Sequence, residues 1–173
     1  MTTQILETAR LALRYLEPTD APFIFELLNE PAWLRYIGDK GIKTVADAER
    51  YIADGPVRMY AQLGFGLYLV ELKAHREPIG ICGLLKRDSL DDVDLGFAFL
   101  ARFWSHGYAY ESAAAVMSYA NRHLEIDRIV AITSPGNQAS AKLLLKLGFT
   151  RDRALSPTGG GEDTILYRKP QQP

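Results

Sequence analysis

The segment from residue 93 to residue 119 most constrains the fold, because its hydrophobic period changes from two to that of a helix. Bulky apolar side chains first alternate with Asp94, Gly96 and Ala98, which predicts a strand with one apolar face and one nearly bare face that carries a carboxylate. The apolar members of this strand are Val93, Leu95, Phe97 and Phe99. After a polar turn over residues 101–107, apolar residues recur at helical spacing, at Ala109, Ala113, Val116, Ala120 and Leu124. The segment therefore predicts a strand, a tight glycine-bearing turn and a long helix.

The turn between this strand and this helix is a candidate phosphate cradle. The start of a helix presents backbone N–H groups that have no partner inside the helix, together with the positive end of the helix dipole. Both features favour an anion such as a phosphate group. The plainer alternative is a surface turn that only caps the helix, as most glycine-bearing turns between a strand and a helix do.

Further strands lie on both sides of this unit. Residues 65–72 and 79–85 have the composition of strands, and their short links predict an antiparallel meander that leads into the 93–99 strand. Residues 128–133 are almost continuously apolar, which is typical of a parallel strand that is covered on both faces. Two last strands are expected from residue 149 onward and at residues 165–168.

The N-terminal part is expected to form a short strand and then helices. The alternation over residues 11–15 predicts the strand, and Thr19 or Asp20 is expected to cap the first helix. This helix should end before Pro31, because the residue before a proline resists helical torsion angles. Residues 31–43 are expected to form a loop or a broken helix.

A second helix is expected after Thr44, with an interruption at Gly55–Pro56, and a last one after Asn137 that ends at a left-handed Gly148. The inward side chains of the last helix are expected to be Ala139, Leu143, Leu144 and Leu147. We therefore predict an α/β fold with a mixed, mostly antiparallel sheet and helices on both faces. An open crevice is expected at the topological switch point between the central strand and the apolar strand after it.

Composition excludes several classes of protein. The chain has 173 residues and a formal net charge of −1, which argues against a general nucleic-acid binder. A single cysteine rules out an intrachain disulfide framework, and neither a signal peptide nor a membrane-spanning run is visible. We expect one cytoplasmic domain over residues 1–170, with a disordered tail at residues 171–173. The three histidines lack metal-ligand spacing, so no metal is expected.

Five segments together resemble the GNAT superfamily of acyl-CoA-dependent N-acetyltransferases, and most closely its RimJ/RimL-like branch of ribosomal-protein alanine N-acetyltransferases. The segments are residues 8–14, 93–97, 104–109, 137–140 and 146–149. Each segment is a weak signal alone, but together they have the order and spacing of the family. The resemblance covers nearly the whole chain. The resemblance implies a GNAT-type sheet with a splayed central parallel strand pair, and acetyl-CoA as co-substrate.

The resemblance places the coenzyme A pyrophosphate on the turn before the long helix. In the superfamily this loop usually begins with Gln or Arg, whereas Trp104 stands there in this chain, and Gly107 and Ala109 hold the later positions. Binding should survive the change, because backbone N–H groups do most of the work. The strand backbone would pair with the pantetheine arm like an added strand. The implied cofactor-binding residues are Phe97, Ala98, Phe99, Trp104, Ser105, His106, Gly107, Tyr108, Ala109, Tyr110, Asn137, Ser140 and Lys146.

Asp94 and Ser140 are the candidate catalytic residues. Asp94 could accept the proton of an attacking ammonium group through a water molecule, or it could be a structural carboxylate bonded to a neighbouring turn. Ser140 could protonate the departing thiolate, as the resemblance to RimL-like enzymes suggests, or could merely belong to a helix cap with Asn137. Leu144 replaces the superfamily's common general-acid tyrosine, a change that RimJ/RimL-like members often share.

The resemblance implies transfer of an acetyl group to a primary amine by direct attack, the acceptor being a protein N-terminus or a small amine. Trp33 and Tyr36 are expected to give the acceptor apolar contact. The alternative function is a non-catalytic acyl-CoA-binding regulatory module. Neither nucleic acid nor membrane is an expected partner, and both monomer and homodimer remain open.

Overall fold

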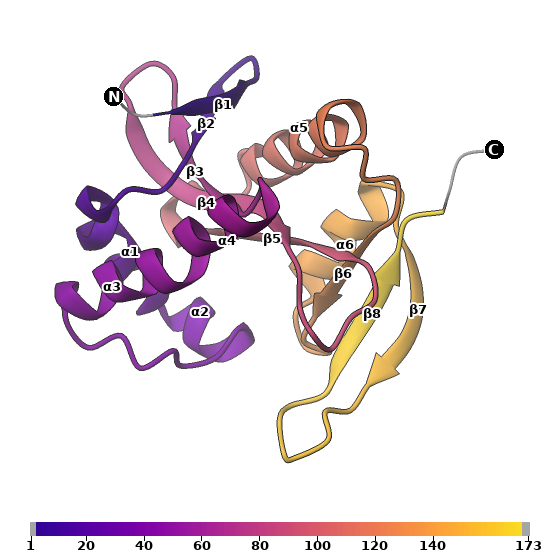
Figure 1. The fold of residues 1–173 in the computed structure, drawn as a ribbon. Coiled ribbons are helices and arrows are strands. Elements are labelled where there is room, and N and C mark those ends of the chain that lie inside the picture. The colour runs from indigo at the N-terminus through magenta and orange to yellow at the C-terminus, as the bar shows by residue number, and fades with distance from the viewer. Residues whose placement is uncertain (1–2, 171–173) are drawn as a thin grey trace.

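The computed structural model describes residues 3–170, so the predicted tail at 171–173 lies outside the described residues. Its centre is one eight-stranded sheet with the strand order β1-β2-β3-β4-β5-β6-β8-β7 (Figure 1). The strands are β1 (Gln4–Glu7), β2 (Leu11–Arg14), β3 (Leu67–Leu72), β4 (Glu77–Leu85), β5 (Val93–Phe99), β6 (Ile129–Thr133), β7 (Thr150–Leu155) and β8 (Thr164–Arg168).

The sheet is antiparallel at every junction except one. Only β5 and β6 run parallel, and their register includes two residue pairs, Val93 with Ile129 and Asp94 with Val130. A parallel connection needs a long crossover, and the helix α5 (Tyr108–His123) supplies it. The mixed, mostly antiparallel sheet and its splayed parallel pair are thus confirmed.

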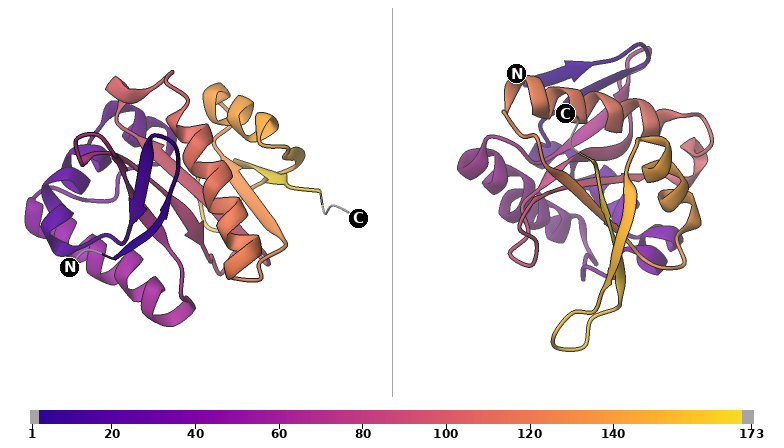
Figure 2. Two further views of the ribbon diagram at one scale, coloured as in Figure 1. Left: turned by 90° about the horizontal axis from the view of Figure 1, so that it is seen from above. Right: turned by 90° about the vertical axis from the view of Figure 1, so that its right-hand side faces the viewer.

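Helices cover both faces of the sheet (Figure 2). On one face, α1 (Ala21–Leu28), α2 (Pro31–Tyr36) and α3 (Val45–Ile52) pack over a core that includes Leu67, Leu69 and Ile81. On the other face, α5 and α6 (Gln138–Lys146) pack over the larger core, which includes Leu95 and Phe99 of the central strand. Two separate apolar layers therefore hold β5 between them.

The central segment folds as its two periods predict. Leu95 and Phe99 are buried under α5, whose buried positions include Ala113, Val116 and Ala120. The near-continuous apolar run after α5 forms β6, which lies inside the sheet between β5 and β8.

Several N-terminal predictions need correction. Residues 31–43 include a regular helix, α2, with Pro31 at its first position, where the missing N–H costs nothing. The predicted interruption at Gly55–Pro56 is confirmed: it is a π-helical turn, η2 (Ala53–Val57), and α4 (Arg58–Leu63) follows it directly. The short 3-10 helix η1 (Pro18–Asp20) precedes α1, and the strand β1 was not predicted.

Two side chains also differ from expectation. Asp20 is the N-cap of α1 by position but makes no side-chain cap bond there, because its carboxylate accepts from Arg14 and from the Glu17 N–H. Ala139 is exposed, whereas Leu144 and Leu147 of the same segment are buried as predicted. By contrast, Thr44 caps α3 with a full capping box, and Gly148 is left-handed with φ 91°.

Candidate active site

The opening between β5 and β6 begins directly after Asp94. Register pairs between the two strands stop there, so along the rest of β5 the edge toward β6 has no strand partner within residues 3–170. Phe97, Ala98 and Phe99 lie along this open edge. Of their backbone groups, the Phe99 carbonyl accepts a hydrogen bond of 2.9 Å from Trp104 Nε1, so the protein itself uses that acceptor. The open edge is the place where an extended, amide-bearing ligand could add as a strand.

At the carboxyl end of β5, the chain passes through η3 (Ala101–Phe103) into the predicted phosphate turn. Ser105 and Gly107 are left-handed, with φ 63° and 81°. The first helical hydrogen bond of α5 runs from the Glu111 N–H to the Gly107 carbonyl at 3.0 Å. Within residues 3–170, the amide groups of residues 105–110 donate to no protein acceptor. Such a run of free N–H groups around left-handed residues forms an anion-binding concavity.

The fit of this turn to a diphosphate therefore rests on its backbone. The side chains in the turn mainly brace one another. The His106 ring stacks on Tyr108 with a centroid distance of 5.5 Å, and its Nδ1 lies 2.7 Å from the Trp104 carbonyl. Trp104, which replaces the usual polar residue, is 47% exposed and anchored by the bond to Phe99. The turn thus keeps its shape without the residue that usually opens this loop.

Helix α6 follows β6, the strand on the other side of the opening. Asn137 caps it, and Asn137 Oδ1 accepts from the Ser140 N–H at 3.2 Å, so the capping role considered for this pair is present. Lys146 Nζ lies 4.5 Å from the centroid of the Tyr110 ring. This contact brings the C-terminal end of α6 next to the first turn of α5.

Asp94 lies at the point where β5 and β6 diverge, and it is only 1% exposed. Its Oδ2 accepts from Arg87 Nε at 2.6 Å, while its Oδ1 makes no hydrogen bond within the described residues. Burial raises the pKa of the Asp94 carboxyl, and the Arg87 guanidinium opposes this rise only in part. The carboxylate is therefore bonded to the turn between β4 and β5, as the structural alternative requires, yet it keeps one oxygen unused.

The two residues that are predicted to contact the amine acceptor, Trp33 and Tyr36, lie on α2. Trp33 is 6% exposed within the core under α1–α3, and its indole N–H has no hydrogen-bond partner in the described part of the chain. Tyr36 is half-buried, with the Arg35 guanidinium 5.0 Å from its ring centroid.

Sequence reasoning did not single out Glu30, whose carboxylate accepts from the Ala101 N–H at 3.0 Å and so ties the start of α2 to η3.

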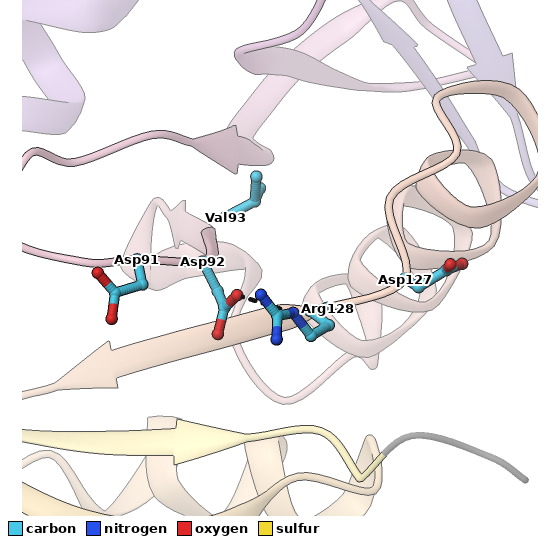
Figure 3. Close-up of a pocket in the computed structure, with 5 residues that line it drawn as sticks. All are labelled: Asp91, Asp92, Val93, Asp127 and Arg128. Carbon is cyan, nitrogen blue, oxygen red and sulfur yellow. Dashed lines mark ion pairs between the residues drawn. The ribbon is translucent and has the colours of Figure 1, made fainter.

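Two further features could carry chemistry, namely Cys82, which is paired with Phe97 on the neighbouring strand, and a surface cavity. Cys82 is fully buried in β4, and burial raises the pKa of its thiol to about 12, so it is no activated nucleophile. An open cavity of about 450 Å³ lies at the amino ends of β5 and β6, where the Arg128 guanidinium faces Asp92 at 3.2 Å (Figure 3). This cavity is at the end of β5 opposite the phosphate turn.

Residues 3–170 contain no group of three or more His, Cys, Asp or Glu side chains placed to hold a metal ion. No helix among them is both long and apolar enough to cross a bilayer.

Comparison with known proteins places the chain in a family. Residues 10–150 match the family described as acetyltransferase (GNAT) domain. The chain is 30% identical over 168 residues to the uncharacterized N-acetyltransferase YoaA of Bacillus subtilis (strain 168), covering 94% of each protein.

Solved structures agree. An acetyltransferase from Agrobacterium tumefaciens str. C58 is 27% identical and superposes with a TM-score of 0.80, covering 99% of this chain and 95% of that one. The ribosomal L7/L12 alpha-N-protein acetyltransferase RimL, in complex with coenzyme A, is 19% identical with a TM-score of 0.81, covering 96% and 97%. At that identity RimL shows the shared fold. From its sequence and its sheet, the chain belongs to the GNAT family of acetyltransferases, which use acetyl-CoA as acyl donor.

Proposed function

We propose that this enzyme transfers the acetyl group of acetyl-CoA to a primary amine by direct attack, without a covalent enzyme intermediate. The observation that carries the proposal is the run of free amide groups at residues 105–110, next to the unpaired edge of β5. The turn would hold the diphosphate, and the strand edge would pair with the pantetheine arm. At about 3.4 Å per residue, β5 spans about 17 Å from Phe99 back to Asp94, which would set the thioester toward the closed end of the opening.

The reaction balances without any further reagent. The amine nitrogen forms a bond to the thioester carbonyl carbon, the carbon–sulfur bond breaks, and coenzyme A leaves as the thiolate. The amine must lose a proton, and we assign its acceptance to Asp94 through a water molecule. A thiol has a pKa of about 8.5, so the thiolate needs little help in leaving, and we assign Ser140 a minor part in its protonation. Orientation along β5 would supply most of the rate.

The acceptor class follows from precedent rather than from contacts. RimL is named for acetylation of ribosomal L7/L12, and another protein of this fold is the ribosomal-protein-S5-alanine acetyltransferase from Vibrio fischeri. We propose a protein N-terminus as the preferred acceptor, with small amines as the alternative. Trp33 and Tyr36 are proposed to contact the acceptor. Trp33 has little exposed surface for that role, so Tyr36 is the better candidate of the two.

The test is release of free coenzyme A thiol from acetyl-CoA across a panel of acceptors. The panel pairs short peptides that have a free N-terminus with the same peptides blocked at the N-terminus, and adds small amines. We expect acceptor-dependent release with free N-termini only, and mass spectrometry should find one added acetyl group on the product. Coenzyme A at one hundred times its Kd should stabilise the fold by about 2.7 kcal/mol.

Failure has two distinct forms. If millimolar acetyl-CoA and coenzyme A give neither calorimetric heat nor thermal stabilisation, the proposed use of the turn is wrong. If both bind but no amine in the panel or in a cell extract becomes acetylated, the non-catalytic binding module is favoured instead.

A further inference from the structure

Arg10, in the turn between β1 and β2, contacts the phosphate turn from behind. Its Nε and Nη2 each lie 2.7 Å from Glu111 Oε2, in the first turn of α5. Its Nη1 donates to the His106 carbonyl at 2.9 Å. One planar guanidinium therefore joins the helix start and the loop before it, a geometry that a lysine ammonium cannot reproduce.

The second oxygen of Glu111 is also occupied. Glu111 Oε1 accepts from Thr8 Oγ1 at 2.5 Å and from the Arg10 N–H at 2.9 Å. Partial burial opposes ionisation of Glu111, but the hydrogen bonds from Thr8 and Arg10 outweigh it and lower the pKa of the carboxyl. The carboxylate is thus charged at neutral pH and fully bound to the β1–β2 turn.

The bond to His106 determines where the next amide points. The His106 carbonyl and the Gly107 N–H belong to one trans peptide group, so they point in opposite directions. With the carbonyl directed at Arg10, the Gly107 N–H must point away from Arg10, among the free amides of residues 105–110. Arg10 also lies 4.5 Å from the Tyr108 ring centroid, and a Cβ on Gly107 would lie 3.3 Å from Arg10 Nη2. The guanidinium therefore packs against the left-handed glycine itself.

Charge gives Arg10 a second effect. A carboxylate in the first turn of a helix competes for the same positive end that would attract a phosphate. The Arg10 guanidinium neutralises Glu111 at a distance of 2.7 Å. Without it, an uncompensated negative charge would stand beside the diphosphate.

We propose that Arg10 is a positioning residue for coenzyme A: paired with Glu111, it orients the peptide group between His106 and Gly107 toward the diphosphate and cancels the carboxylate beneath it. This inference rests on the proposed function, because it needs coenzyme A as the ligand of the turn. It concerns the nucleotide end of the ligand alone, and that restriction makes it testable.

The experiment compares Arg10→Gln, Arg10→Lys and the double variant Arg10→Gln/Glu111→Gln with the wild type. Calorimetry measures Kd for coenzyme A and for pantetheine, which lacks the diphosphate. We expect Arg10→Gln to raise the Kd for coenzyme A about tenfold or more, which is the scale of one lost charge-assisted hydrogen bond. The Kd for pantetheine should stay unchanged. The double variant should recover part of the loss, because the uncompensated carboxylate is gone. Arg10→Lys should fall between wild type and Arg10→Gln.

The matched control is Lys73→Gln, in the neighbouring β3–β4 turn. Lys73 and Arg10 line the same shallow surface cavity as Tyr108, but Lys73 donates to the Thr8 carbonyl and pairs with Glu7 instead of contacting the loop. The Lys73→Gln variant removes an equal charge from the same surface. Its Kd for coenzyme A should therefore stay within about twofold of the wild-type value.

Three results would overturn the inference. The first is that Arg10→Gln binds coenzyme A with the affinity of the wild type. The second is that Arg10→Gln loses equal affinity for coenzyme A and for pantetheine, which indicates a general structural effect. The third applies if Arg10→Gln fails to fold: it is that Arg10→Lys binds coenzyme A with the affinity of the wild type. If the wild type itself binds no coenzyme A, the proposed function fails, which is a separate outcome from unchanged affinity in the Arg10 variants.

Discussion

At the scale of single residues, Asp94 combines deep burial, one charged partner and one unused oxygen. Because its pKa is raised, the folded protein holds this proton at a higher pH than the unfolded chain does. The free energy of unfolding should therefore fall as pH rises from the ordinary aspartate pKa to the raised one. In Asp94→Asn this fall should be absent. The same change should lower kcat/KM about a hundredfold, the contribution of a general base, and should remove the acidic limb of the pH–rate profile.

The companion variant is Arg87→Gln, which keeps the Asp94 carboxylate but removes its partner. The acidic limb should then move to higher pH, because the guanidinium holds the pKa of Asp94 down. Calorimetric affinity for coenzyme A should be unchanged in both variants. Full activity in Asp94→Asn would leave Asp94 with only its structural bond to the β4–β5 turn.

At the scale of elements, α6 owes its start to Asn137. Asn137→Ala removes the cap on the Ser140 N–H and should cost about 1 kcal/mol in urea unfolding. Ser140→Ala keeps that backbone N–H and its bond, so its stability should match the wild type. Turnover in Ser140→Ala should fall only modestly, because a thiolate leaves readily. A loss of stability in Ser140→Ala equal to that of Asn137→Ala would contradict this division of roles.

At the scale of the whole molecule, Arg14 links the sheet to the first helical layer. It pairs with Asp20 of η1 and with Glu71 of β3, each at 2.8 Å, and its side chain is 14% exposed. Burial opposes the charge on Arg14, but the hydrogen bonds that Arg14 donates to Asp20 and Glu71 outweigh burial and raise its pKa. Arg14→Met would leave Asp20 with only the Glu17 N–H and Glu71 with only the more distant Arg76, at 3.6 Å, as partners among the described residues, and should cost about 3 kcal/mol or more in urea unfolding.

The control for this prediction is the triple variant Arg14→Met/Asp20→Asn/Glu71→Gln, which removes the stranded charges and should recover much of the loss. Affinity for coenzyme A should stay at the wild-type value in every folded variant, because these residues do not contact the phosphate turn. Unchanged stability in Arg14→Met would mean that the network contributes nothing to the fold.

The order of the elements and their faces were predictable from the sequence. The change of period at Phe99, the continuous apolar run of β6 and the caps at Thr44 and Gly148 all depend on residues close together in the chain. A local pattern of this kind determines which face of a helix or strand is buried, whichever element packs against that face. The free amides of the turn before α5 were predictable for the same reason, since free amides at a helix start are a local property.

Only the tertiary structure decided what surrounds that turn. Arg10 and Glu111 are separated by 101 positions, and the contact of Lys146 with Tyr110 joins two different helices. Nor does any local signal in the sequence mark Asp94 as the partner of Arg87, or Trp33 as a core residue. Periodicity reports which side of an element is apolar, whereas ion pairs and free carboxylate oxygens depend on which distant elements are packed together. The sequence by itself therefore determined the scaffold and the turn with free amides, and the packing determined which charged groups surround that turn.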